Sequence, residues 1–408
     1  MNLYQKIKVS GAFLQAWLRG WRTRHKIVVI ESDDWGTIRT SSRRAYDDLL
    51  RRGFRMNQSP LGADSLESSQ DLIQLFAVLA EVDQFGHPAC LTANMILTNP
   101  DFSRIRENGY GRYYAEPVTD TFQRTPERRE VAALWKQGLD QKLFVPQLHG
   151  LEHIRWWDWL AALQAGSQEA HLAFEWQMCG LPGTVSREKR NFYGKYYLKN
   201  ATGAPSLPEI AVSIRESISL FERIFGFTPD TTIAPGYCWY DEIEKIWKDN
   251  GIRYIQSDIR QFMGDEKRTA LHFPGEVGAS GPIYLIRNCQ FEPAACRIAG
   301  KKSCLERCLR QISLAFSFRK PAVISSHRYN YMGSVFPENR EKNLEQLRKL
   351  LTAIQSRWPD VVFLNSSGLG HLIEFGDDKI EQAMAKPETR GYSPETNPPS
   401  KRNFTFKN

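Results

Sequence analysis

The sequence predicts an α/β protein whose mainly parallel sheet closes into a barrel, and three observations support this. Residues 26–36, KIVVIESDDWG, are an apolar run that ends in acids and a glycine, which is typical of a buried parallel strand delivering polar residues at its carboxyl end. Strand-like and amphipathic helical segments then alternate along the chain. Seven or eight such units favour a barrel over an open sheet.

The remaining elements follow in order within a barrel domain expected over residues 24–375. A helix over about 41–53 follows the first strand. Further strands are expected at 89–95, 143–147, 231–233, 254–256, 283–286, 322–325 and 361–364. The clearest amphipathic helices are expected at 207–225, 241–250, 304–318 and 340–358. Two stretches rich in aromatic and charged residues, 101–141 and 155–206, interrupt the alternation and are expected to form long insertions over the barrel mouth.

The two ends of the chain differ from the barrel. Residues 1–23 place apolar side chains roughly on one helical stripe among Lys and Arg, which predicts an amphipathic helix. The favoured interpretation is a helix packed across the bottom of the barrel, and peripheral membrane contact is the alternative. Residues 376–408 are rich in Pro, Lys, Glu and Asn and predict a polar tail with little structure of its own.

Composition narrows the class of partner and the compartment. The net charge of +8 comes from 54 basic and 46 acidic residues that are interspersed, without zinc-finger or RNA-binding patterns, so no nucleic-acid partner is expected. The seven cysteines are odd in number and widely spread, which favours free thiols in a reducing compartment. The sequence shows no signal-peptide pattern and no transmembrane segment. We therefore expect a soluble, cytoplasmic protein.

Two pairs of residues predict a metal site. His149 and His153 are four residues apart, so both imidazoles point the same way if the segment begins a helix. Asp33 and Asp34 are adjacent at a strand end, where two buried carboxylates need a cation or strong donors. Asp34 and the histidines would leave an open position, as catalytic zinc requires, and Asp33 could deprotonate the bound water. The simpler alternatives are a helix cap for the acids and a surface histidine pair.

Four segments, in order, resemble the motifs of the polysaccharide deacetylase family, carbohydrate esterase family 4. ESDDWG at 31–36 resembles the family segment Thr-Phe-Asp-Asp-Gly, and 149–153 matches His-x-x-x-His. IAPGY at 233–237 matches Arg-x-Pro-Tyr-Gly in part, and SSH at 325–327 is similar to Leu-x-His. The resemblance covers roughly residues 24–375.

The resemblance implies a distorted (β/α) barrel with fewer than eight complete units, long loop insertions, and a metal-dependent hydrolase that deacetylates an N- or O-acetylated sugar or polysaccharide. Asp33 would be the base and His327 the general acid. The ligands of a divalent ion, zinc in the first place, would be Asp34, His149 and His153. The expected substrate-binding residues are Pro235, Gly236, Tyr237 and Trp239.

One departure from the family pattern generates two further predictions. The family arginine that braces the base falls at Ile233, so another residue must orient Asp33. Arg287, after the strand PIYLI, is predicted to contact Asp33, with Arg39 and Arg328 as weaker candidates and pairing of Arg287 with Glu292 as the alternative. Asp258, at the end of the strand RYIQSD, is predicted to accept a hydrogen bond from His327 and to raise its pKa.

Two other functions stay open from the sequence. A glycoside hydrolase or another amidase could use the same fold, with Asp33 and Asp258 as the two carboxylates that a glycosidase needs. An inactive carbohydrate-binding protein would explain the missing arginine. The presence of all three expected ligands, of the expected base Asp33 and of His327 favours an active hydrolase.

Overall fold

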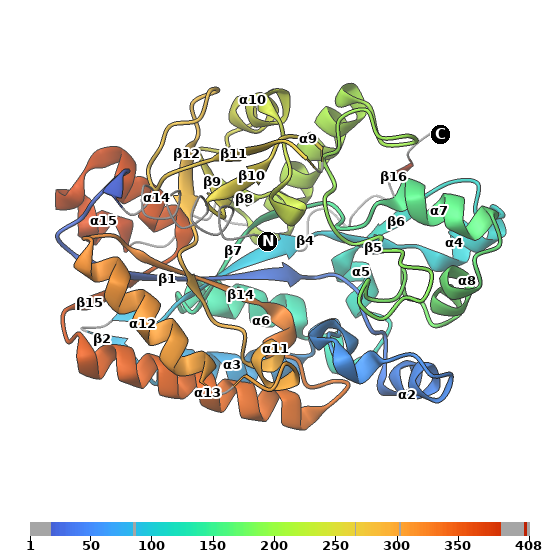
Figure 1. The fold of residues 1–408 in the computed structure, drawn as a ribbon, viewed down its shortest axis with the longest axis horizontal. Helices are drawn as coiled ribbons and strands as arrows, with labels where there is room; N and C mark the ends of the chain where they lie inside the picture. Colours follow the sequence, from blue (N-terminus) through green and yellow to red (C-terminus); the bar gives the residue numbers. More distant parts are fainter. Residues whose placement is uncertain (1–17, 85–86, 266, 302, 385–403, 406–408) are drawn as a thin grey trace, which may run out of the picture.

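The protein is built on a nine-stranded parallel sheet, seen in the computed structural model, which describes residues 18–84, 87–265, 267–301, 303–384 and 404–405 (Figure 1). The strand order is β12-β9-β8-β7-β4-β1-β14-β13, and β15 also pairs with β1. These strands are β1 (Lys26–Trp35), β4 (Leu91–Ile96), β7 (Phe144–Gly150), β8 (Thr231–Ile233), β9 (Tyr254–Ser257), β12 (Ile283–Ile286), β13 (Cys289–Gln290), β14 (Ala322–His327) and β15 (Val361–Leu364).

One segment borders both ends of this sheet. Residues 283–286 pair with β9, and residues 289–290 pair with β14. Between them the Arg287 amide donates to Ser257 O and the Asn288 amide donates to Val323 O. The segment therefore bridges the two borders, and the described strands form a distorted (β/α) barrel, as predicted.

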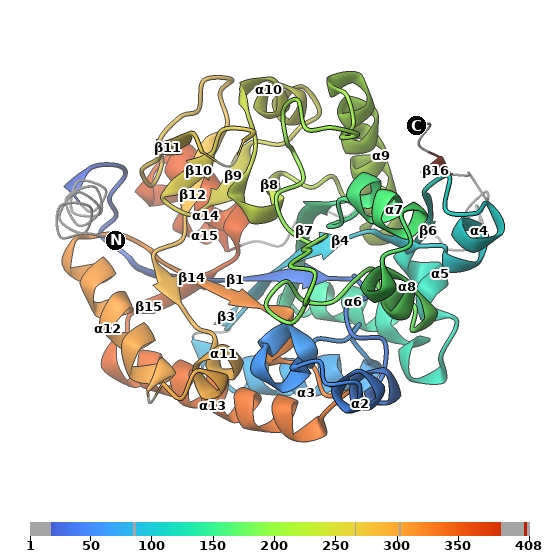
Figure 2. The same cartoon turned by 45° about the vertical axis from the view of Figure 1, so that its right-hand side comes forward.

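Helices cover the outside of the barrel (Figure 2). Around it α12 packs on α13, α13 on α3, α3 on α6, and α9 on α10. The helices of this layer are α2 (Arg43–Arg51), α3 (Ser69–Ala80), α6 (Val131–Asp140), α9 (Leu207–Phe225), α10 (Asp241–Asp249), α11 (Pro293–Ile298), α12 (Cys304–Ser317), α13 (Pro337–Arg357) and α14 (Ser366–Phe375). Capping boxes begin α3 and α9, which satisfies backbone amides that would otherwise lack a partner.

Short elements complete the chain. The stretch 101–141 contains α4, β6, α5 and η3 and ends in the barrel helix α6, whereas 155–206 contains α7 and α8 before a long irregular segment. The bounds are β2 (Asp83–Gln84), β3 (His87–Pro88), β5 (Thr98–Pro100), α4 (Phe102–Glu107), β6 (Tyr114–Pro117), α5 (Val118–Phe122), η3 (Pro126–Arg128), α7 (Trp156–Gln164), α8 (Gln168–Glu175), β10 (Arg260–Phe262) and β11 (Thr269–Leu271).

Little of the two predicted ends falls within the described residues. Of the N-terminal helix, residues 1–17 lie outside them, and Lys320 Nζ donates hydrogen bonds to the carbonyls of Gly20 and Trp21. Residues 376–384 include η6 (Asp377–Lys379) and α15 (Ile380–Ala383). Phe404–Thr405, labelled β16, pairs with β6. Within the described residues, no helix has the length and apolar character to cross a bilayer.

A bulge at the end of β1 positions the two acids. The pairing of β1 with β4 shifts register between Ser32 and Trp35, and Asp34 has a left-handed φ of 74°. In a regular strand adjacent side chains face opposite sides of the sheet, whereas here both Asp33 and Asp34 line one cavity. Because a left-handed conformation costs a non-glycine residue roughly 1–2 kcal/mol, the surrounding structure must stabilise this bend.

Gly36 follows the bulge, and its substitution provides a test of how the bulge is stabilised. Its φ is +86°, and a Cβ added there would lie 2.2 Å from Ile96 O. We predict that Gly36→Ala lowers the free energy of unfolding by at least about 1–3 kcal/mol, as measured by urea denaturation. Gly166→Ala is the matched control, because Gly166 has a φ of +74° and no atom within 4 Å of an added Cβ. Equal losses in the two variants would show that the packing against Ile96 is unimportant.

Candidate active site

A cavity of about 590 Å³ opens at the carboxyl ends of the barrel strands. The strand ends contribute Asp33, Asp34, His149, His153, Ile233, Ala234, Gly236, Tyr237 and His327. Two loops complete the wall, residues 58–61 and the irregular segment after α8, which contributes 182–184, 191, 193 and 194. The second insertion predicted from the sequence therefore builds part of the cavity, at the face where active sites of such barrels form.

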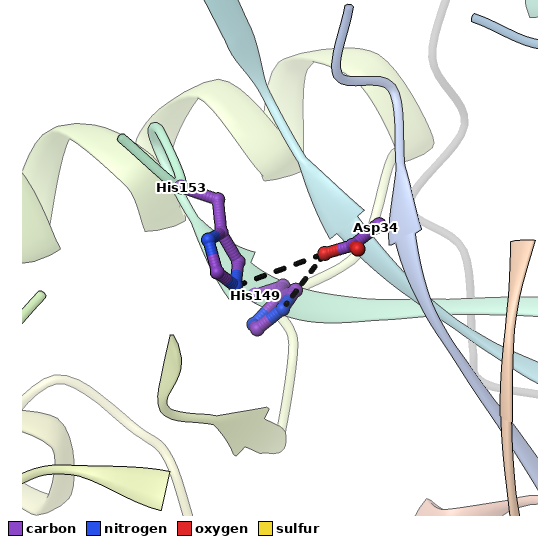
Figure 3. Close-up of side chains that lie close together, drawn as sticks. All are labelled: Asp34, His149 and His153. Atoms are coloured by element: carbon purple, nitrogen blue, oxygen red, sulfur yellow. Dashed lines mark ion pairs between the residues drawn. The ribbon is translucent and has the colours of Figure 1, made fainter. Parts of the chain in front are cut away.

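Three side chains converge on one point in this cavity (Figure 3). Asp34 Oδ1 lies 3.6 Å from His149 Nε2 and 3.7 Å from His153 Nε2. Tetrahedral zinc with bonds of about 2.0–2.1 Å separates its ligands by roughly 3.3 Å, so small adjustments would allow all three to bind one ion. The predicted ligand set is therefore brought together, and its chemistry fits a divalent metal.

The hydrogen bond of His149 orients it for this role. Its Nδ1 lies 2.9 Å from Ile233 O, and because a carbonyl oxygen only accepts, Nδ1 carries the proton and Nε2 is the nitrogen left to bind an ion. Burial lowers the pKa of His153 to about 3, so the His153 imidazole is neutral. The segment does not begin a helix, because His149 lies in β7, which ends at Gly150, and His153 follows in a loop; the two imidazoles converge without helical spacing.

The second oxygen of Asp34 is held by Arg39. Arg39 Nη2 donates to Asp34 Oδ2 at 3.2 Å, and the guanidinium lies 3.7 Å from the centre of the Tyr193 ring. Burial opposes ionisation, but Arg39 together with the neighbouring histidines outweighs it and holds the pKa of Asp34 well below its ordinary value. Asp34 is thus a carboxylate whose free oxygen faces the two histidines.

Arg287 braces Asp33, as predicted. Its Nη1 and Nη2 donate to the two Asp33 oxygens, both at 2.6 Å, and its Nε donates to Glu31 Oε2. Asn94 Nδ2 donates a further bond to Asp33 Oδ1 at 2.7 Å. Burial would raise the pKa of Asp33, but the guanidinium holds it well below its ordinary value. A bidentate pair of this kind fixes the carboxylate plane as well as its charge.

Arg39 and Arg328, the weaker candidates for orienting Asp33, bind other residues. Arg39 contacts Asp34, as described above. Arg328 is fully buried and binds Asp64 and Glu67. The alternative that Arg287 pairs with Glu292 is also wrong, because Glu292 binds His327.

Glu292 replaces Asp258 as the partner of His327. His327 Nδ1 lies 2.6 Å from Glu292 Oε1, whereas Asp258 accepts a hydrogen bond from the Ile259 amide. The prediction for Asp258 is therefore wrong. Burial would lower the pKa of His327, and the Glu292 carboxylate outweighs it and raises the pKa to about 9. His327 Nε2 lies 3.9 Å from Asp33 Oδ2, so a protonated imidazole faces the base across the cavity.

Only part of the predicted substrate wall lines the cavity. Gly236 and Tyr237 do, whereas Pro235 and Trp239 are buried and do not contribute to the lining. Trp239 instead packs in the core, with ring centres 6.3 Å from Trp247. Tyr237 has a left-handed φ of 52°, an unusual conformation for a bulky residue that is concentrated at functional sites.

Sequence reasoning missed Glu292 and Asn94 as site residues. Asn94 is a polar residue inside the buried strand LTANMI, and a polar residue facing a barrel interior near Asp33 could have been recognised as a hydrogen-bond partner. Glu292 follows β13, a two-residue strand too short to stand out in the sequence. Its contact with His327 depends on the pairing of β13 with β14, which no local pattern predicts.

Comparison with known proteins gives limited similarities. Residues 203–288, about a fifth of the chain, match the family model described as Glycosyl hydrolase family 57. A comparison with curated proteins finds no match. The family-model match supports the coarse statement that the chain is a carbohydrate-active hydrolase.

Three solved structures share the overall chain path at low identity. The 4-alpha-glucanotransferase from Thermococcus litoralis is 10% identical with a TM-score of 0.44, and the match covers 85% of this chain but only 40% of that one. A CE4 family pseudoenzyme from Bacillus anthracis is 12% identical, covering 85% and 66%, with a TM-score of 0.36. The alpha-amylase AmyC from Thermotoga maritima is 11% identical, covering 87% of this chain and 75% of that one, with a TM-score of 0.35. Likenesses at this level carry no argument about the reaction.

The convergence of Asp34, His149 and His153 predicts different roles for the two acids, with Asp34 binding the metal and Asp33 not. Asp34→Asn and the double variant His149→Ala, His153→Ala should weaken zinc binding by more than about 100-fold, beyond what loss of an outer partner costs, because they remove proposed ligands. Asp33→Asn should stay within about 10-fold of the parent. Isothermal titration with zinc and elemental analysis measure this. Equal loss in Asp33→Asn and Asp34→Asn would contradict the assignment.

The contact between His327 and Glu292 predicts a change in pH dependence. A group whose pKa is raised stays protonated until the pH passes that raised value, so activity that needs protonated His327 is lost on the alkaline side. Glu292→Gln should move the alkaline limb of kcat/KM down by about one pH unit or more. Asp258→Asn should leave that limb in place. A shift caused by Asp258→Asn alone would restore the original assignment.

Proposed function

We propose that the chain is a metal-dependent hydrolase that removes an acetyl group from an N- or O-acetylated sugar or polysaccharide. One observation carries the proposal. A carboxylate and two imidazoles converge on a single point in a cavity, and a second carboxylate and a histidine with a raised pKa stand beside them. Catalytic metal sites have this three-ligand arrangement.

The residues of the cavity provide the groups that hydrolysis of an acyl bond needs: metal ligands and a base. A divalent ion held by Asp34, His149 and His153, zinc in the first place, would polarise the acyl carbonyl and acidify a water molecule. Cobalt, nickel or manganese would suit the same donors. Asp33 is fixed by Arg287 and Asn94, so it can orient the attacking water and accept its proton.

His327 completes the reaction on the other side of the cavity. Its Nδ1 is bound to Glu292, and its Nε2 faces Asp33. The imidazole can therefore donate a proton from Nε2 to the departing amine or alcohol while Glu292 stabilises the cation. A nearby divalent cation would lower the pKa of His327 from about 9 toward neutrality, where a general acid is most effective.

A glycoside hydrolase is the second candidate, because residues 203–288 match Glycosyl hydrolase family 57. Such enzymes commonly need two carboxyl groups on opposite sides of the bond, one of them protonated. Among the described residues that line the cavity, only Asp33 and Asp34 carry carboxylates. They are neighbours in sequence, and the pKa of each lies below its ordinary value. This argues against the glycosidase, and the Arg287 brace removes the main support for an inactive binding protein.

An assay that measures both acetate and new reducing ends distinguishes a deacetylase from a glycosidase. Purified protein, stripped of metal and then reloaded with zinc, should release acetate from one member of a panel of acetylated mono-, oligo- and polysaccharides. The same reactions should show no new reducing ends, and Asp33→Asn should lower the rate by about 100-fold or more. New reducing ends without acetate, unaffected by metal removal, would overturn the proposal in favour of a glycosidase.

A further inference from the structure

Among the described residues, the hydroxyl of Tyr237 has one hydrogen-bond partner, Arg287, and the chemistry of that partner fixes the direction of the bond. Arg287 Nη1 lies 3.2 Å from Tyr237 Oη. A guanidinium carries only donors, so the phenolic oxygen accepts this bond. The Tyr237 proton is therefore not used in it.

That proton has no acceptor within the part of the chain that the structure describes. The Asp33 oxygens accept from Arg287 and Asn94, and Asp258 accepts from the Ile259 amide. Tyr237 lines the cavity and is partly exposed there. The free O–H can therefore be directed to a molecule in the cavity.

Its position is set by the same guanidinium that fixes the base. Arg287 Nη1 lies 2.6 Å from Asp33 Oδ2 and 3.2 Å from Tyr237 Oη, so those two oxygens are no more than 5.8 Å apart, the sum of the two distances. In the proposed reaction, a water oriented by Asp33 would attack an acyl carbon close enough to the phenol for its hydroxyl to reach the acyl oxygen. Burial raises the pKa of Tyr237, which keeps the hydroxyl protonated.

The backbone also holds the phenol in place. Gly236 and Tyr237 are both left-handed, with φ values of 62° and 52°, and the Tyr237 amide donates to Ala234 O. At Gly236 an added Cβ would lie 3.0 Å from Lys195 Cγ and 3.2 Å from its backbone nitrogen. The loop after α8 thus packs directly against the turn that directs Tyr237.

Resting on the proposed acyl hydrolysis, we infer that the Tyr237 hydroxyl is a catalytic hydrogen-bond donor to the oxygen that gains negative charge when water attacks the acyl carbonyl. Accepting a bond from Arg287 polarises the phenol and strengthens its donation. A donor held in place before the reaction begins stabilises the transition state more than the ground state. Removal of the hydroxyl should therefore lower kcat and leave KM nearly unchanged.

Tyr237→Phe tests this with little change of shape. On the acetylated substrate that the parent hydrolyses, kcat should fall by about 100-fold, as loss of one such donor typically causes, while KM and zinc affinity stay within about 3-fold. Tyr240→Phe is the control, because Tyr240 is a buried tyrosine of the same segment outside the cavity and should have parental kinetics. Circular dichroism checks the fold of both.

Binding of inorganic phosphate gives a readout that does not depend on turnover. Phosphate is a tetrahedral oxyanion, and zinc-loaded Tyr237→Phe should bind it about 10-fold or more weakly than the parent in isothermal titration, whereas Tyr240→Phe should match the parent. Parental kcat and parental phosphate affinity in Tyr237→Phe would overturn the inference. A parent protein that releases no acetate from any substrate would instead overturn the proposed function, so the two failures are distinguishable.

Discussion

The bidentate pair between Arg287 and Asp33 is the interaction on which the site depends. It lies inside the barrel, where an unpaired carboxylate or guanidinium would be very costly. Arg287 also binds Glu31, whose other oxygen accepts from Ser366. Two acids and one cation would leave an excess negative charge, and burial raises the pKa of Glu31 accordingly. The proposed base Asp33 is therefore part of a buried network that extends to Ser366 at the start of α14.

A similar network supports Asp34, the proposed metal ligand. Arg39 binds Asp34, and Arg328, which is fully buried, binds Asp64 and Glu67. Glu67 in turn accepts from the Gly36 amide immediately after the bulge. The two acids at the end of β1 thus face one cavity but are neutralised by different arginines. This separation leaves Asp34 Oδ1 available to the proposed metal, while Arg287 fixes Asp33 as the proposed base.

The sequence was sufficient for the fold and for the residues that strand ends deliver. Asp33, Asp34, His149 and His327 all follow or end buried strands, and such positions gather on one face of a parallel barrel. Arg287 could be predicted for the same reason. Glu292 could not, because it reaches His327 through a pairing of two-residue length, and Asp258 was preferred only for its place after a clear strand. Trp239 is aromatic and near the motif, but residue type alone does not distinguish a sugar-stacking ring from a core ring.

Arg287 occupies the position at which the bridging segment leaves β9 and joins β14. The residue that closes the wall of the barrel is therefore also the residue that aligns Asp33 and polarises Tyr237. Separation of the bridging segment from β9 or β14 would therefore displace Arg287 from both Asp33 and Tyr237. Closure of the barrel and alignment of the proposed base are consequently coupled, and a partly opened barrel, even with all three proposed metal ligands in place, would have no oriented base.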